Sequence, residues 1–226
     1  MILLQNIIES NYHYQPVWML VLIVISVMII GYLFSSFHTR FMAVMKSFFK
    51  MRFANQLARE EHSLTHPASI FLSLNYLITA SLFILQLLAF KFSFSGQSFL
   101  LLLEIIACLL LVFIVKITAI KILAFIFDQL PLANEYIFTV FLVNQILGIG
   151  LLPVIIFISY ASSFFADFFI YTGILLMVLS FIIRVGKGAI VALSDKGTTL
   201  FYLFLYLCTL EILPLLIAIK LFWKLA

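Results

Sequence analysis

Long uninterrupted runs of apolar residues dominate this chain and restrict it to one environment. An α-helix needs about 20 apolar residues to cross the hydrocarbon core of a bilayer. The runs that approach or exceed this length are residues 17–37, 68–90, 98–115, 136–160, 168–183 and 199–223. They are continuous and do not alternate with a period of two, as the strands of a membrane barrel would. The sequence therefore predicts an all-α fold, a polytopic transmembrane helical bundle of about six spans.

The composition agrees with this prediction. Hydrophobic residues make up 65% of the 226-residue chain and charged residues only 10%, which is far from the balance of a soluble domain. We find no internal repeat, no low-complexity tract and no soluble module. Residues 1–226 are therefore expected to form a single integral-membrane domain.

The distribution of lysine and arginine predicts the orientation. With six spans, the first, third and fifth connections share one side and carry ten basic residues, whereas the opposite side carries three. Cytoplasmic loops of membrane proteins are enriched in lysine and arginine. This predicts that these loops lie in the cytoplasm and that both termini lie on the opposite side of the membrane. Orientation alone explains the net charge of +4, so no nucleic-acid partner is implied.

The connection 38–67 is the longest polar segment. It contains an apolar stripe with three- and four-residue spacing: Phe41, Val44, Met45, Phe48 and Phe49. Basic side chains lie beside it: Arg40, Lys46, Lys50 and Arg52. The pattern favours a basic amphipathic helix on the cytoplasmic surface, with the lipid bilayer as its partner. The alternative is an extension of the first span.

Two further segments leave their structure open. Residues 116–134 either continue the third span as one long tilted helix or bend at the interface into a surface helix. The fifth span, residues 168–183, is short and has the option of continuing into 186–193.

Glu211 is the most unusual residue in the predicted spans. It lies near the middle of the last run, with Cys208 and Pro214 on the same helical face. An ionisable group at bilayer depth costs a few kcal/mol, so it marks a candidate functional site. Pro214 also leaves a backbone carbonyl without its helical donor. Candidate partners of Glu211 are three basic residues, Lys121, Arg184 and Lys187.

Other polar residues within the spans are weaker candidates. Glu104 lies in the third span, and Asn144 and Gln145 lie in the fourth, close to Gly148, Gly150 and Pro153. A kinked or unwound helix there would line a cavity, as in some transporters, whereas close packing of a bent helix is the simpler interpretation. Asn75, Gln86, Asn144 and Gln145 are expected to bond helices together. Cys108 and Cys208 are expected to pack in the interior without forming a disulfide.

The carboxy-terminal string Tyr-Leu-Cys-Thr-Leu-Glu-Ile-Leu-Pro, residues 206–214, resembles the closing motif of an uncharacterised family. The family comprises small polytopic inner-membrane proteins of Bacteroidota and is catalogued as a domain of unknown function. The basic loop after the first span and residues 184–188 are similar too. The resemblance implies a location in the cytoplasmic membrane of a Gram-negative cell. It implies no activity, cofactor or catalytic residue.

Two functions fit these features. The first is a non-enzymatic partner or assembly subunit of a cell-envelope complex, binding other membrane proteins or a second copy of itself. It is favoured because nucleotide and paired-cysteine motifs are absent, so no cofactor, metal or catalytic residue is expected. The alternative is a small proton-linked transporter or channel-like carrier that uses Glu211.

Overall fold

The protein is an all-α bundle, as the sequence predicts. The structure, a computed structural model, describes residues 16–49, 67–92, 99–126, 130–160 and 163–193. These residues contain no strand. They form the helices α2 (Val17–Ser36), α3 (His38–Phe49), α5 (Pro67–Phe92), α6 (Phe99–Ile126), α7 (Leu130–Tyr160) and α8 (Ser163–Leu193).

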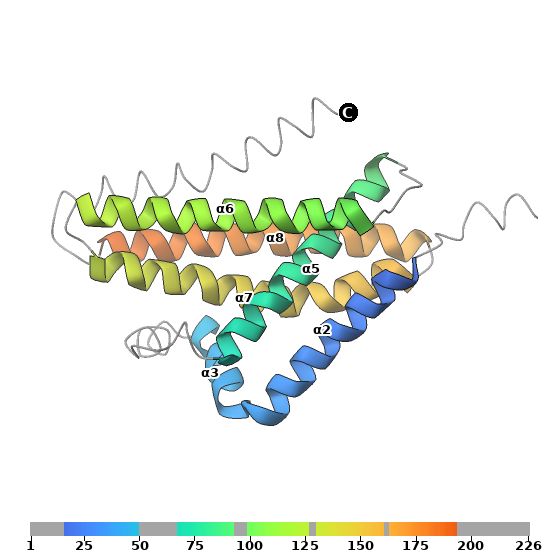
Figure 1. Cartoon of the computed structure of the whole chain (residues 1–226), viewed down its shortest axis with the longest axis horizontal. Coiled ribbons are helices and arrows are strands. Elements are labelled where there is room, and N and C mark those ends of the chain that lie inside the picture. The colour runs from blue at the N-terminus through green and yellow to red at the C-terminus, as the bar shows by residue number, and fades with distance from the viewer. Residues whose placement is uncertain (1–15, 50–66, 93–98, 127–129, 161–162, 194–226) are drawn as a thin grey trace, which may run out of the picture.

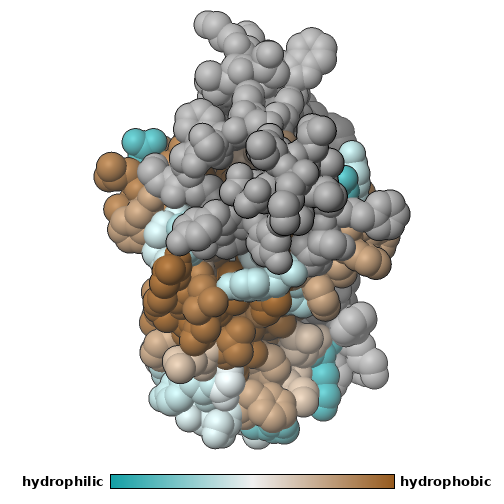
Figure 2. Space-filling model, turned by 90° about the vertical axis from the view of Figure 1, so that its right-hand side faces the viewer, coloured by the Kyte–Doolittle hydropathy of each residue, from teal (hydrophilic) through white to brown (hydrophobic). Residues whose placement is uncertain are grey.

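Five of these helices, α2, α5, α6, α7 and α8, are long and apolar enough to cross a membrane. They correspond to the first five predicted spans, and the chain is a multi-pass membrane protein. Large apolar side chains are exposed along them, and Figure 2 shows such residues gathered in a broad area of the described surface. In water this surface would be unfavourable, but lipid tails solvate it. The sixth predicted span, 199–223, lies outside the described residues.

Helix α7 is the centre of the bundle. It contacts α2, α3, α5, α6 and α8. In the most apolar stretch of each helix, 56% of α7 residues are buried but only 6% of α6 residues. Helices α6, α7 and α8 follow one common direction, and α2 and α5 cross it at an angle (Figure 1). Helix α6 therefore lies at the periphery of the described bundle, where it contacts α5 and α7 and leaves most of its surface exposed.

Buried side chains form three clusters. One joins α2, α5 and α7 through Ile23, Leu82 and Leu147, among others. A second joins α2, α3, α5 and α7 and includes Leu33 and Leu72. The third lies between α6 and α7 and is centred on Ile120, Ala124, Ala133, Tyr136, Ile137 and Val140. Each cluster uses the stripe that a helix presents to its neighbours.

Helix α3 is the predicted amphipathic helix after the first span. It is separated from α2 by a bend at Phe37, so it does not extend that span. Val44 is a buried member of the second cluster, and Phe41 packs against that cluster. Part of the apolar stripe thus contacts protein, while Lys46 is exposed. The side chain of Arg40, and Lys50 and Arg52 entirely, lie outside the described residues.

The two segments that the sequence left open are both helical continuations. Helix α6 continues without interruption past Lys116 and Lys121 to Ile126, and α8 continues to Leu193. Residues 130–134 belong to α7. Residues 116–126, which follow the predicted end of the third span, therefore extend the same long helix. At one end of the molecule α6, α7 and α8 extend beyond α3 and the start of α5 (Figure 1).

Candidate functional site

Polar side chains concentrate where α5 packs against α7. The amide of Gln145 is buried and donates from Nε2 to the Ser69 carbonyl oxygen at 3.1 Å. It also lies within hydrogen-bond distance of Ser69 Oγ at 2.8 Å and Ser73 Oγ at 3.2 Å. This one side chain of α7 therefore binds the first two turns of α5.

A second polar contact joins the same helices further along. Gln86 Nε2 donates to Ser159 Oγ at 2.7 Å and to the Ile155 carbonyl oxygen at 3.4 Å. Such interhelical bonds in membrane proteins contribute about 0.6 to 2 kcal/mol each. The prediction that Gln86 and Gln145 bond helices together is confirmed.

Between these two contacts the helix backbones approach closely. A Cβ atom placed on Gly148 would lie 2.7 Å from Tyr76 Cα and 2.9 Å from Tyr76 Cβ. Only glycine fits there, because it carries no Cβ. Helix α7 stays helical through Gly148, Gly150 and Pro153, and the Pro153 side chain is exposed. This region of α7 therefore forms a close helix–helix contact.

Several polar atoms near this contact are buried without a hydrogen-bond partner: Ser26 Oγ, both amide atoms of Asn75, and Asn144 Oδ1. Ser26 follows Ile23 by one turn, Asn75 follows Leu72 by one turn, and Asn144 precedes Leu147 by one turn. The three residues thus lie between the two core clusters shared by α2, α5 and α7. An unsatisfied buried polar group costs about 1–3 kcal/mol. Sequence analysis missed Ser26, because a single serine in an apolar run carries no distinguishing signal.

Glu104 and Cys108 are separate from this polar contact. Both lie on α6, one turn apart on the same helical face, and both are exposed. The expectation that Cys108 packs in the interior is wrong, because Cys108 is exposed and lies in the apolar stretch of α6 that is almost uncovered. The structure does not bring Glu104 to Asn144 and Gln145, which are buried between α5 and α7.

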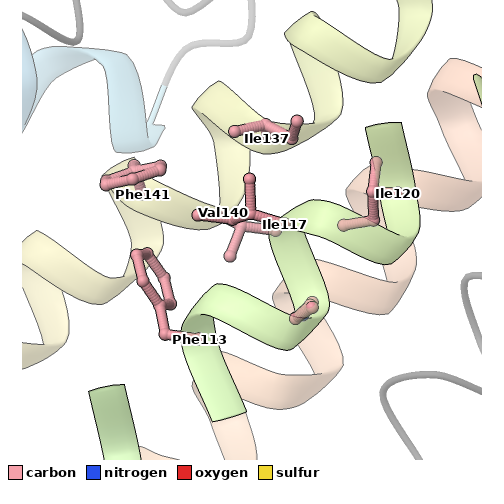
Figure 3. A pocket seen from close by; sticks show the side chains of 7 residues that line it. Phe113, Ile117, Ile120, Ile137, Val140 and Phe141 are labelled. Atoms are coloured by element: carbon pink, nitrogen blue, oxygen red, sulfur yellow. The ribbon is translucent and has the colours of Figure 1, made fainter. Parts of the chain in front are cut away.

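A narrow apolar notch lies between α6 and α7, where the two helices extend beyond α3 (Figure 3). It is lined by Phe113, Lys116, Ile117, Ile120, Ile137, Val140 and Phe141 and has no room for a water molecule. The Phe113 and Phe141 rings meet edge to face with centroids 4.9 Å apart. Lys116 Nζ lies 6.0 Å from the centre of the Tyr136 ring. The notch is a packing contact, not a ligand site.

Part of the predicted site falls elsewhere in the chain. Glu211, Cys208 and Pro214 lie outside the described residues, and their roles remain predictions. Among the residues that the structure covers, no group of three or more histidine, cysteine or acidic side chains is placed to hold a metal ion.

Comparison with known proteins gives one result. A family model described as a domain of unknown function (DUF4271) matches residues 18–222, which is nearly the whole chain. No curated protein and no solved structure matches it. The helical membrane bundle described above therefore belongs to the DUF4271 family.

Proposed function

We propose that this protein is a non-enzymatic subunit of a cell-envelope complex in the bacterial inner membrane, with both termini in the periplasm. The observation that carries the proposal is the exposed face of α6. Glu104 is the one charged residue in the first part of this helix, residues 99–115, and the rest of the described bundle covers almost none of this face. An ionisable group that faces lipid costs a few kcal/mol, and a partner helix would remove that cost.

The chemistry of Glu104 defines the partner. The partner is a membrane helix, from another protein or a second copy of this chain, with a cation or a hydrogen-bond donor at the depth of Glu104. The exposed apolar side chains Leu100, Leu103 and Leu111 on α6 supply the packing surface around it. Close packing of this kind drives association between membrane helices.

Cys108 allows a direct test because it lies one turn from Glu104 on the exposed side. A photoactivatable maleimide is attached to Cys108 in a Cys208→Ser background, and native membranes are irradiated. We expect one specific cross-linked product that weakens in the Glu104→Gln variant. The matched control is Asp167→Asn, which removes another exposed carboxylate and should leave the product unchanged.

Affinity purification in mild detergent completes the test. Mass spectrometry of the purified sample should identify the same partner, or a dimer of this chain, and the Glu104→Gln variant should retain less of it. A wild-type protein that purifies as a lone monomer and forms no product at Cys108 contradicts the proposal.

The proton-linked carrier is the second candidate. It rests on Glu211, Glu104 and Asn144 and on the kink predicted at residues 148–153. In the structure Gln145 bonds to α5 and Gly148 packs against Tyr76, so this part of α7 forms a packed helix contact. The carrier predicts that Glu211→Gln preserves membrane levels yet abolishes the cellular phenotype, and complementation of a deletion strain measures this directly.

A further inference from the structure

The face of α8 that packs against the bundle ends in cationic residues. Residues on this face follow one another at three- and four-residue steps, as a helical stripe does: Ile170, Gly173, Met177 and Ser180. Arg184 takes the next position on the same stripe, and Lys187 follows three residues later. The side chain of Arg184 therefore starts on the face of α8 that contacts protein, while the residue remains partly exposed.

The described residues use little of the hydrogen-bonding capacity of Arg184. Its Nη2 donates to Ser180 Oγ at 3.4 Å, a long bond, and its Nε is buried without a partner. No described acid pairs with it: Asp167 precedes it by seventeen residues on α8, about 25 Å along the helix, and Glu104 lies on the exposed face of α6. A guanidinium carries five N–H donors in a planar arrangement that matches carboxylate and phosphate oxygens. Arg184 can therefore bind an anion that the described side chains do not supply.

The depth of Arg184 in the membrane follows from the contacts of α7. A short connection joins α7 to α8, so the two helices run in opposite directions, and Leu176 of α8 lies beside Gly150 of α7. Arg184, eight residues further along α8, is therefore level with Leu142. Leu142 packs in one cluster with Val44 of α3, the basic amphipathic helix after the first span. Because such helices lie at the membrane surface, Arg184 lies close to the lipid headgroups of the same leaflet.

The charges on α6, α7 and α8 near this level are mostly positive. Lys187 lies about 4.5 Å from Arg184 along α8, at the end of the apolar stretch Phe165–Lys187. Lys116 of α6 lies over the Tyr136 ring, which is about 9 Å from the level of Arg184 along α7. The one described acid of α7 is Glu135, about 10 Å from that level. Basic sites between helices at the interface are typical of anionic-lipid binding.

We propose that Arg184 binds the phosphate of an anionic phospholipid beside α8, at the level of α3. The guanidinium donates to the phosphate oxygens, and exposed apolar side chains of the same helix, Ile174 and Val178, supply the surface for an acyl chain. The lipid neutralises a cation that is unfavourable at the edge of the hydrocarbon. The proposal does not depend on the partner proposed for Glu104, because it concerns a different helix and a different ligand.

A lipid titration of the full chain tests the site. Phosphatidylglycerol added to delipidated protein in detergent should raise the melting temperature of the wild type. Arg184→Gln should need about tenfold or more of this lipid for the same rise, because hydrogen bonds from a charged donor are lost. Lys121→Gln, which removes an exposed lysine of α6, should respond as the wild type does. No rise in the wild type, or an equal response of Arg184→Gln, would overturn the proposal.

Two further ligands identify the source of the anion. Inorganic phosphate and phosphatidylcholine, each at the concentration used for phosphatidylglycerol, should raise the melting temperature of the wild type little. An equal rise with inorganic phosphate would show a site for a free anion and contradict the proposal. If Arg184→Gln lowers the melting temperature by the same amount with and without phosphatidylglycerol, the anion belongs to the protein itself and the proposal is wrong.

Native mass spectrometry measures binding without relying on Arg184→Gln, whose folding the lost charge can impair. Arg184→Lys keeps the charge, but an ammonium group does not form the paired hydrogen bonds of a guanidinium. The wild type should retain a phosphatidylglycerol molecule after release from the detergent micelle, and Arg184→Lys should retain less of it. Equal retention by the two proteins would count against a phosphate site at Arg184.

Discussion

The contact between Gly148 and Tyr76 gives the sharpest stability prediction. Replacing Gly148 by alanine places a Cβ 2.7 Å from Tyr76 Cα and 3.1 Å from the Tyr76 backbone nitrogen. The obstructing atoms belong to the backbone of α5, so no side-chain rotation can relieve the overlap. The two helices must move apart.

The size of the effect follows from two opposing terms. Overpacking of a well-packed contact costs about 1–3 kcal/mol. Alanine is better than glycine in a helix by about 0.5–1 kcal/mol. The expected net loss is therefore up to about 2.5 kcal/mol. For a chain of this size, that loss corresponds to a melting temperature up to about 10 °C lower.

Gly150 supplies the matched control. A Cβ at Gly150 meets only Leu176 Cδ1, at 4.0 Å, which is an ordinary contact. Gly150→Ala should therefore raise the melting temperature by about 1–4 °C through the helix term alone. Thermal unfolding of both variants in the same detergent, followed by fluorescence-detected size exclusion, compares them. If Gly148→Ala is as stable as Gly150→Ala, the close approach of α5 and α7 described here is refuted.

Three further predictions concern the polar contacts and the orientation. Gln145→Leu should lower the stability by about 1–2 kcal/mol, because its bonds to the first turns of α5 are lost, and thermal unfolding measures this. Asn75→Leu should leave the stability unchanged or raise it in the same assay, because both amide atoms of Asn75 are buried without partners. Alkaline phosphatase fused at Ala226 should be active and a fluorescent protein fused at Asn55 should be bright; the reverse pattern would overturn the predicted topology.

The spans were predictable because bilayer thickness sets a minimum length for an apolar run. Their ends were less so. Lys116 marked the predicted end of the third span, yet α6 continues for ten more residues. A helix satisfies its own backbone hydrogen bonds, so a charged side chain need not end it. The continuation of α8 past Arg184 has the same cause.

The arrangement of the polar residues was harder to predict. The apolar residues of α6 surround the helix on all sides, so no periodicity identifies the face that carries Glu104. Asn144 and Gln145 are adjacent in the sequence but point in different directions, and only Gln145 reaches Ser69 and Ser73. Such pairings depend on how α5 crosses α7, and one sequence without tertiary contacts does not specify that crossing.

The lengths of α6, α7 and α8 have a consequence for the surrounding lipid. With 28, 31 and 31 residues, they measure about 42–46 Å, whereas the hydrocarbon core is about 30 Å thick. Helix α2, with 20 residues, matches that thickness. The bilayer must therefore thicken on the side of the long helices, or those helices must tilt or project from it. Because each ångström of mismatch costs energy, proteins with equally long helices would gather around this one before any direct contact forms.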